Sequence, residues 1–217
     1  MLASIRRERA AGGAAALLLL LLASSLAAPA RAGSFSVLTY NVAGLPEGLS
    51  GSNPSVNIPL ISPLLNDYDL VNVQEDFAYH AQLVSQATHP YQSVPGPTQG
   101  SYGDGLSRFS VFPFTDHTRI QWTDCFGTLS NGSDCLTPKG FSAARHELAP
   151  GAFVDVYNFH ADAANDAGSI AARQSNLRQL ADYIVANSAG NAVLVMGDSN
   201  SLGAPRTSSP SSWRRPA

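Results

Sequence analysis

The sequence predicts an α/β fold of the α+β kind, in which packed β-sheets are flanked by helices. Strand-like apolar runs and helical patterns occur near both ends of the chain, and a series of consecutive strands lies between them. The 217 residues are 44% hydrophobic and 13% charged, which provides enough apolar material for a core and excludes wholesale disorder. No heptad, collagen or longer repeat is present, so fibrous and solenoid folds are excluded.

The first part of the chain predicts two strands, each followed by a helical segment. Residues 35–41 form a strand-like run that ends in a polar residue, and a loop rich in Gly, Pro and Ser follows over residues 44–54. Apolar residues at helical spacing over residues 58–65 predict a helix, which two internal prolines make short or irregular. Residues 69–74 predict the second strand, and residues 78–87 predict a further helix.

The remainder of the chain predicts a loop, several strands and one long helix. Residues 94–105 are rich in Gly, Pro and Ser and predict the loop. Short strands are predicted over residues 106–112, 119–126, 140–148 and 152–159. Ser169 is the expected N-cap of an amphipathic helix over residues 170–187, and residues 192–196 predict a buried strand. The apolar face of the helix is expected to contain Leu177, Leu180, Ala181 and Ile184.

Residues 1–32 have the pattern of a secretory signal peptide. Three arginines precede an apolar run over residues 14–22, and an Ala-x-Ala site follows with cleavage expected after Ala30 or Ala32. The alternative is a membrane anchor, but the run is short for a span of about 20 residues. The pattern therefore predicts a secreted protein without a transmembrane anchor after cleavage. The remaining chain has nine basic and 15 acidic residues, so its bulk charge indicates no nucleic-acid-binding surface.

Export makes the two cysteines interpretable. Cys125 and Cys135 are ten positions apart, and two cysteines in an oxidising compartment allow one intrachain disulfide. The alternative is a pair of free thiols. Neither cysteine lies near a histidine at a zinc-like spacing. Asn131 begins a glycosylation sequon, which has meaning only in a eukaryotic host.

Polar side chains follow the predicted strands where ligand-binding loops converge in α/β sheets. They are Asn41, Glu75, His160, Asp198 and Asn200. Carboxylate and amide oxygens suit a hard divalent cation, and an imidazole can hydrogen-bond a phosphoryl oxygen. Each residue taken singly also fits the alternative of a solvated cap or turn residue. Their ordered occurrence is what points to a site.

Four motifs carry these residues in a fixed order. They are residues 37–46 (VLTYNVAGLP), 71–75 (VNVQE), 156–160 (VYNFH) and 193–200 (VLVMGDSN). Together they resemble the motifs of the endonuclease/exonuclease/phosphatase superfamily, which has the deoxyribonuclease-I-like fold, and most closely its secreted sphingomyelinase-type members. The resemblance implies a four-layer sandwich of two mixed β-sheets flanked by helices. It also implies hydrolysis of a phosphoester with the help of a divalent metal.

The resemblance implies a role for each strand-end residue. Glu75 is the expected main ligand of Mg²⁺, or of Mn²⁺ or Ca²⁺ in its place, and Asn41 assists at the metal. His160 is expected to contact the scissile phosphate and Asp198 to orient the attacking water. Asn200 is expected to help hold the phosphoryl group and the nucleophile. The metal stabilises charge that grows on the phosphoryl oxygens, and positioning dominates such reactions.

Two further segments resemble substrate-facing elements of the same superfamily. Residues 101–110 (SYGDGLSRFS) contain Arg108, and residues 137–141 (TPKGF) contain Lys139. We assign both side chains to substrate binding by this resemblance. The alternative for both is turn chemistry with a solvated cation.

The resemblance implies further strands and a closing Asp-His pair after the last motif, and the sequence has neither. No histidine follows His160 and no aspartate follows Asp198. Residues 201–217 contain five Ser, three Pro and three Arg, which predicts a disordered or out-of-frame tail. We therefore expect residues 33–200 to be a partial domain of a truncated or frame-shifted gene, incomplete at the C-terminus, with an uncovered sheet edge and apolar face.

The sequence thus predicts a secreted, Mg²⁺-dependent phosphodiesterase that acts on a phospholipid of the sphingomyelin type or on nucleic acid. The acidic chain favours the phospholipid, because a surface that binds a duplex is usually basic. The alternatives are a secreted deoxyribonuclease and an inactive relative that lacks the Asp-His pair. The expected partner is the phosphodiester substrate, and no stable protein partner is implied.

Overall fold

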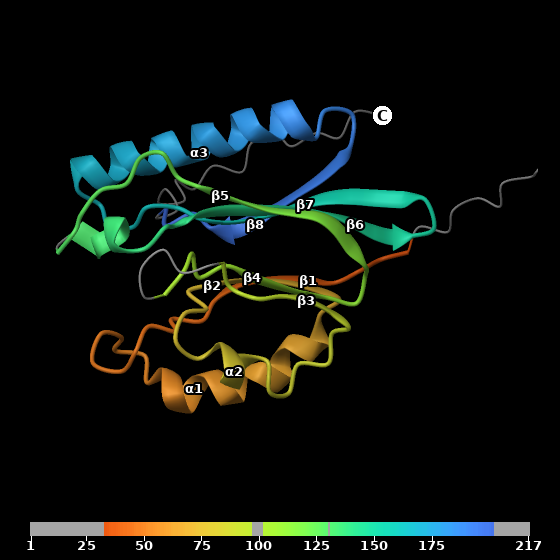
Figure 1. Cartoon of the computed structure of the whole chain (residues 1–217), viewed down its shortest axis with the longest axis horizontal. Coiled ribbons are helices and arrows are strands. Elements are labelled where there is room, and N and C mark those ends of the chain that lie inside the picture. The colour runs from red at the N-terminus through yellow and green to blue at the C-terminus, as the bar shows by residue number, and fades with distance from the viewer. Residues whose placement is uncertain (1–32, 97–101, 130, 202–217) are drawn as a thin grey trace, which may run out of the picture. The chain divides into compact units, whose positions relative to one another are not determined.

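The computed structural model describes residues 33–96, 102–129 and 131–201 of the chain. Two four-stranded sheets stack face to face here, and helices cover the outer face of each, which makes four layers (Figure 1). This architecture confirms the predicted sandwich of two mixed sheets flanked by helices. The expected leader over residues 1–32 and nearly all of the expected tail over residues 201–217 lie outside the described residues. Among the helices that are described, none has the length and apolar character needed to cross a bilayer.

The first sheet has the strand order β1-β2-β4-β3. Its strands are β1 (Val37–Asn41), β2 (Leu70–Gln74), β3 (Tyr91–Ser93) and β4 (Ser107–Ser110). β1 and β2 are parallel, so the chain crosses between them through α1 (Pro54–Ile61) and the 3-10 helix η1 (Ser62–Asp67). The short helix α2 (His80–Leu83) follows β2, and α1 and α2 lie on the outer side of this sheet (Figure 1).

The second sheet has the strand order β5-β6-β7-β8. Its strands are β5 (Phe114–Gln121), β6 (Gly140–Ala149), β7 (Ala152–His160) and β8 (Ala192–Asp198). β7 and β8 are parallel and are joined by the long helix α3 (Ala167–Asn187), which covers the outer face of the sheet (Figure 1). The 3-10 helix η2 (Asn131–Leu136) lies in the loop between β5 and β6. The predicted disulfide between Cys125 and Cys135 is confirmed and closes this loop.

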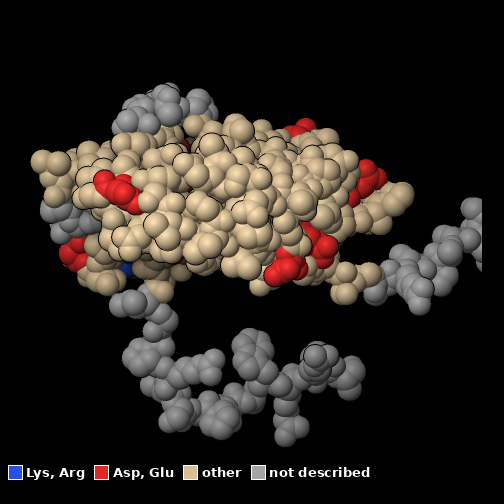
Figure 2. Space-filling view, turned by 90° about the horizontal axis from the view of Figure 1, so that it is seen from below, with Lys and Arg blue, Asp and Glu red and all other residues tan. Residues whose placement is uncertain are grey.

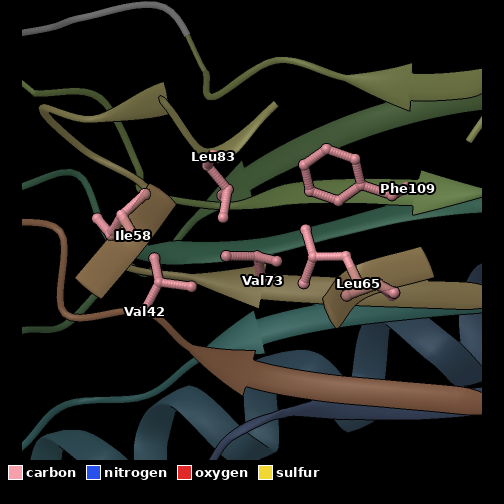
Figure 3. Packing of buried hydrophobic residues seen from close by; sticks show 7 residues of the cluster. Val42, Ile58, Leu65, Val73, Leu83 and Phe109 are labelled. Carbon is pink, nitrogen blue, oxygen red and sulfur yellow. The ribbon is translucent and has the colours of Figure 1, made fainter. Parts of the chain in front are cut away.

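Each helical layer buries an apolar cluster against its own sheet. Under α1 and α2 the cluster comprises Val42, Ile58, Leu65, Val71, Val73, Leu83 and Phe109 (Figure 3). Under α3 it comprises Trp122, Phe141, Ala143, Tyr157, Phe159, Ala161 and Leu180. These two clusters provide most of the hydrophobic stabilisation of the helices, because burial of apolar side chains is the dominant favourable term in folding. Both sheets therefore have a fixed helical cover on the outer side.

The structure differs from the sequence prediction in several elements of the fold. β5 spans residues 114–121 and not 119–126, and β8, predicted to be buried over residues 192–196, is buried there only at Met196. β3 was not expected, because an edge strand of three residues has too little periodicity to be recognised. α2 has four residues rather than the ten predicted over residues 78–87. The N-cap of α3 is Asp166 and not Ser169, because the Asp166 carboxylate accepts hydrogen bonds from the backbone N–H groups of Gly168 and Ser169 at 3.0 and 3.1 Å.

The buried face of α3 is more polar than predicted. Leu180 is buried and Ile184 packs against the core, but Leu177 is 37% exposed. The buried positions one and two turns before Leu180 are Asn176 and Ala172. Asn176 can be buried because its amide donates to the Asp124 carbonyl at 2.9 Å and accepts from the Asp162 N–H at 3.0 Å. A pattern of apolar residues alone could not identify this face.

The two sheets are joined by buried amide side chains. The Asn72 amide donates to the Tyr157 carbonyl at 3.1 Å, and the Gln74 amide donates to Asn158 Oδ1 at 2.7 Å. Asn158 Nδ2 in turn donates to the carbonyls of Val73 and Ser107 at 3.0 and 3.1 Å. We call Asn72, Gln74 and Asn158 the inter-sheet amides. Because these hydrogen bonds are directional, they fix β7 over β2 more tightly than apolar packing would.

We predict that Asn158→Ala destabilises the protein by about 3 kcal/mol, because it removes the buried hydrogen bonds that Asn158 makes to Gln74 and to two carbonyls of the first sheet. Urea unfolding followed by far-UV circular dichroism measures the change. Asn187→Ala is the control, since the Asn187 amide is exposed and donates only to the Tyr183 carbonyl. Equal unfolding free energies for the two variants would show that the inter-sheet amides do not hold the sheets.

Two histidines at the Phe114 end of the second sheet are kept neutral. His146 is completely buried on β6, and its ring lies 5.2 Å from that of Phe114. Burial and the nearby Arg108 lower the pKa of His146 to about 4. Burial, Arg108 and Arg119 together lower the pKa of His117 to about 3. Both rings are therefore uncharged in the folded protein at neutral pH.

We predict that the protein loses stability as the pH falls below about 6.5, because the unfolded chain then binds protons on His117 and His146 that the folded chain excludes. The stabilisation is fully present above pH 6.5 and is lost as the pH falls toward 4. At pH 5 the contribution of His146 amounts to about 2 kcal/mol. Urea unfolding at pH 7.5 and pH 5 measures the loss, and His146→Gln should reduce the difference between the two values. A pH-independent unfolding free energy in this range would contradict the prediction.

Candidate active site

The predicted strand-end residues meet at one edge of the two sheets. Asn41 ends β1 and Glu75 follows β2, and these strands are parallel neighbours. His160 ends β7 and Asp198 ends β8, where the two residues are register partners. The parallel arrangement in each sheet brings both strand ends to the same edge, and the stacking of the sheets brings the two edges together.

Asn41 connects the two carboxylates of the site. Its Nδ2 donates to Glu75 Oε1 and to Asp198 Oδ2, at 2.9 Å in each case. Its Oδ1 accepts from the backbone N–H of Ala43 at 2.9 Å, which fixes the orientation of the amide. A single amide group therefore holds carboxylates that are far apart in the sequence within reach of one point.

His160 lies close to both of these carboxylates. Its Nε2 lies 3.9 Å from Glu75 Oε1 and 3.8 Å from Asp198 Oδ2. The ammonium of Lys139 lies 3.3 Å from the same nitrogen. Burial and the Lys139 charge lower the pKa of His160 to about 3, so the imidazole is neutral.

Asp198 and Asn200 are fixed by the turn that follows β8. Burial alone would raise the pKa of Asp198, but the hydrogen bonds from Asn41 and from the Asn200 N–H outweigh it and hold this pKa below its ordinary value. The Asn200 N–H donates to Asp198 Oδ1 at 2.9 Å, and its side-chain amide donates to the Ala161 carbonyl at 2.9 Å. Asp198 is thus ionised. The side chain of Asn200 connects the turn after β8 to the residue that follows β7.

Comparison with known proteins agrees with this geometry. No family model matches the chain. It is 40% identical over 181 residues to a sphingomyelinase of Mycobacterium bovis, which covers 78% of this chain and 34% of the relative. The chain thus spans about one third of the length of this curated relative. The structure also resembles those of sphingomyelinase C from Streptomyces griseocarneus, with a TM-score of 0.65, and of a beta toxin variant from Staphylococcus aureus with bound magnesium ions, with a TM-score of 0.63.

These two structures are 23% and 20% identical in sequence to the chain, and they share its fold. The similarity to sphingomyelinase C covers 78% of this chain and 65% of that one, and the similarity to the beta toxin covers 80% and 67%. The chain is thus a homologue of a sphingomyelinase over the region that the two share, and it has the fold of these structures. The recognition made from the four motifs is therefore confirmed at the level of the superfamily.

The backbone at the site is held in an unusual conformation. Glu75, Ala43 and Asn200 all have positive φ, at 56°, 49° and 49°. The Glu75 carbonyl accepts from the Gly44 N–H at 3.0 Å, and a Cβ on Gly44 would lie 2.6 Å from that same oxygen. Only glycine allows this close approach. Left-handed backbone outside glycine persists where the surroundings impose it, and such residues gather at functional sites.

Lys139 lies in the site as the resemblance implied, but its charge is already partnered. It forms an ion pair with Asp134, a buried residue that also accepts from the Ala163 N–H at 2.7 Å. The ammonium is therefore held next to His160 and does not extend into solvent. The sequence prediction missed Asp134, because nothing in the pattern linked it to the lysine five positions later.

Arg108 does not lie in the site, and its assignment to substrate binding is corrected here. Its side chain is fully buried between the sheets, where it donates to the Val156 carbonyl at 3.3 Å and to the Ser142 hydroxyl at 3.1 Å. Burial lowers its pKa to about 9. The residue joins β4 to β6 and β7 and is not accessible to a substrate. The strand predicted over residues 106–112 correctly contains it, but the sequence could not show which face of the sheet it occupies.

A second buried network behind Glu75 was also missed. The carboxylate of Asp76 is buried and contacts His80 Nδ1 and the Ser107 hydroxyl, at 2.7 Å in each case. Its backbone N–H donates to the Gly105 carbonyl at 3.0 Å. Asp76 therefore fixes the chain directly after Glu75. The only signal in the sequence was that an acidic residue follows the glutamate, which is common on exposed loops as well.

The charges of the site suit a divalent cation. The carboxylates of Glu75 and Asp198 are partly exposed, and the groups between them are a neutral amide and a neutral imidazole. The nearest ammonium, that of Lys139, is paired with Asp134. Within the described ranges no group of three or more His, Cys, Asp or Glu side chains is arranged as a metal cage. An ion here would be held by one or two carboxylates with water and substrate oxygens, as Mg²⁺ prefers.

We predict that Gly44→Ala lowers the affinity for Mg²⁺ at least tenfold and destabilises the protein by about 2 kcal/mol, because the new Cβ displaces the Glu75 turn. Isothermal titration with MgCl₂ and urea unfolding measure the two effects. Gly51→Ala in the same loop is the matched control, since a Cβ at Gly51 meets no atom within 4 Å. Equal Mg²⁺ affinity in the two variants would contradict the role of this turn.

Proposed function

We propose that the protein is a secreted, divalent-metal-dependent phosphodiesterase that cleaves a phospholipid of the sphingomyelin type. The observation that carries the proposal is the convergence of Asn41, Glu75, His160 and Asp198 on one point, where two carboxyl side chains lie side by side. The relative of 40% identity is a sphingomyelinase, and a beta toxin of the same fold was solved with magnesium ions. The signal-peptide pattern of residues 1–32 supports secretion.

In this proposal Glu75 is the carboxylate ligand of the metal. The Asn41 amide holds Glu75 and Asp198 in place, with its oxygen turned toward Ala43, so we assign to it the positioning of the metal ligand. A bound divalent ion would stabilise negative charge on the phosphoryl oxygens and on the leaving group. The residues fit such an ion because their oxygens are hard donors and their net charge is negative.

The other side chains handle the phosphoryl group and the water. The Lys139 ammonium can donate a hydrogen bond to a phosphoryl oxygen, and the neutral His160 can do so in the tautomer that carries the proton on Nε2. The ionised Asp198 can accept a hydrogen bond from the attacking water and orient it. Asn200 positions Asp198 through its backbone N–H, and its amide fixes the adjoining strand end.

Charge favours a phospholipid over nucleic acid as the substrate. Residues 33–201 contain six basic and 15 acidic side chains. Five of the six basic groups are engaged by other parts of the described chain: Arg108, Arg119, Lys139, Arg145 and Arg173. On the face seen in Figure 2, acidic groups are visible at several places and basic ones are almost absent. Binding to a nucleic-acid backbone depends on free Lys and Arg side chains, and this part of the protein offers few of them.

We predict that the protein releases phosphocholine from sphingomyelin in the presence of Mg²⁺ and that EDTA abolishes this release. Glu75→Gln should lower the rate of release at least 100-fold, because it removes the charged metal ligand. Phosphocholine is measured by mass spectrometry. Glu147→Gln, whose carboxylate accepts only from the Gly151 N–H in the β6–β7 turn, is the matched control. An active Glu75→Gln variant would refute the proposed site.

The same preparation distinguishes the two alternatives. Nicking of plasmid DNA without release of phosphocholine would identify a deoxyribonuclease. A folded protein that turns over neither substrate, with Mg²⁺, Mn²⁺ or Ca²⁺, would identify an inactive relative.

A further inference from the structure

A pocket of about 490 Å³ opens directly beside the site. Glu75 and Lys139 contribute to its wall, so it is continuous with the reaction centre. The rest of its lining is largely apolar or aromatic and includes Leu45, Leu49, Phe77, Tyr102 and Leu136. A soluble polar substrate would not require such a lining, because ligand pockets match the polarity of the groups that they enclose.

Two of these leucines form the rim of the pocket and are largely exposed to solvent. Leu49 is 69% exposed and Leu136 is 59% exposed. We call them the rim leucines. They come from loops far apart in the sequence, one after β1 and one at the end of η2. Exposed apolar side chains that border a reaction site indicate an apolar partner.

The loop that carries Leu49 is held in a fixed conformation. The N–H groups of Leu49 and Ser50 donate to the Pro46 carbonyl at 3.0 and 3.1 Å. The hydroxyls of Ser50 and Ser52 donate to the Ala43 carbonyl at 3.2 and 3.0 Å. Leu49 is therefore presented outward by a tight turn and cannot withdraw into the core without breaking these hydrogen bonds.

The segment that carries Leu136 is held in a different way. The preceding residue, Cys135, is bonded to Cys125, and its N–H donates to the Gly127 carbonyl at 2.9 Å. Asp134 is buried and paired with Lys139. Leu136 thus follows two fixed residues directly and is also presented outward.

The aromatic wall between the rim leucines is preformed. The ring of Phe77 lies so close to Gly105, which has φ of 69°, that a Cβ there would lie 2.5 Å from a ring carbon. The ring of Tyr102 meets that of Phe77 edge to face, with a centroid distance of 6.4 Å. The pocket therefore requires no rearrangement to admit a ligand of its size.

We propose that the rim leucines insert into the surface of a zwitterionic phospholipid bilayer and that the pocket between them leads the lipid phosphate to Glu75. The inference rests on the proposed function and deepens it, because it names the surface through which the substrate enters. A lipid fits the pocket since its phosphate suits the metal and Lys139, and its apolar part suits the leucines. A second copy of the chain on this face would cover the reaction centre.

The charge of the protein specifies the kind of bilayer. The rim leucines provide contacts that salt does not screen, and among residues 33–201 few basic groups are free to attract anionic lipids. Binding should therefore be driven by apolar insertion and should persist at high ionic strength. By contrast, membrane binding that depends on anionic lipids weakens as the salt concentration rises.

Flotation of the full chain with vesicles of equimolar sphingomyelin and phosphatidylcholine tests the proposal. EDTA is present throughout, so binding is measured without turnover and independently of the proposed chemistry. We expect Leu49→Asp and Leu136→Asp each to lower the partition coefficient at least tenfold, in both 0.1 M and 1 M NaCl. Val185→Asp on α3 is the matched control, since Val185 is 73% exposed and lies outside the pocket. Circular dichroism melts verify that each variant is folded.

A second measurement avoids the introduction of charge. In Leu49→Trp and Leu136→Trp the indole emission should shift to the blue on addition of vesicles and should be quenched by brominated phosphatidylcholine, whereas Val185→Trp should show neither effect. The proposal is overturned if the tryptophan at the rim remains in water, if the Asp variants bind as well as Val185→Asp, or if only anionic vesicles bind. Dimerisation that the Leu49→Asp change abolishes would assign the face to a second copy instead. Vesicle binding without hydrolysis would reject the proposed function but retain this surface.

Discussion

The hydrogen bond between Gln74 and Asn158 is the contact on which the geometry of the site depends. It joins the two sheets at 2.7 Å, and both partners lie within two residues of a side chain of the site. Glu75 follows Gln74, and His160 lies two positions after Asn158, on the same face of β7. The separation of 3.9 Å between Glu75 and His160 is therefore set by the packing of one sheet on the other. A slip of either sheet would move a carboxylate away from the imidazole.

Amides achieve this placement in a way that apolar residues could not. Leucine or valine at position 158 would fill the interface, but dispersion contacts tolerate small displacements of one sheet along the other. The amide of Asn158 satisfies two carbonyls of the facing sheet and accepts from Gln74, so displacement leaves buried polar groups without partners. Arg108 acts in the same way farther along the interface, where it contacts both Val156 and Ser142.

The sequence revealed what depends on local periodicity and on motif order. The strand predicted over residues 69–74 is β2 (Leu70–Gln74), and Glu75 and His160 lie at strand ends as expected. The sequence could not reveal which charged side chains point into the protein interior. Arg108 is charged yet fully buried, and Asp134 holds Lys139 across a loop, because both depend on partners that are distant or irregular in sequence. The N-cap of α3 was misplaced by three residues for a simpler reason, since Asp166 and Ser169 are both good caps and they bond to each other.

The turn at Ala43 and Gly44 links the reaction centre to the pocket rim. The Ala43 N–H orients Asn41, and the Ala43 carbonyl accepts the hydroxyls of Ser50 and Ser52 in the loop that carries Leu49. The Gly44 N–H holds the carbonyl of Glu75. The left-handed conformations of Ala43 and Glu75 are thus imposed by the same set of hydrogen bonds that fixes the loop. A ligand that contacts this loop therefore contacts a backbone that is joined to Glu75 through hydrogen bonds, because the loop and the carboxylate share the same turn.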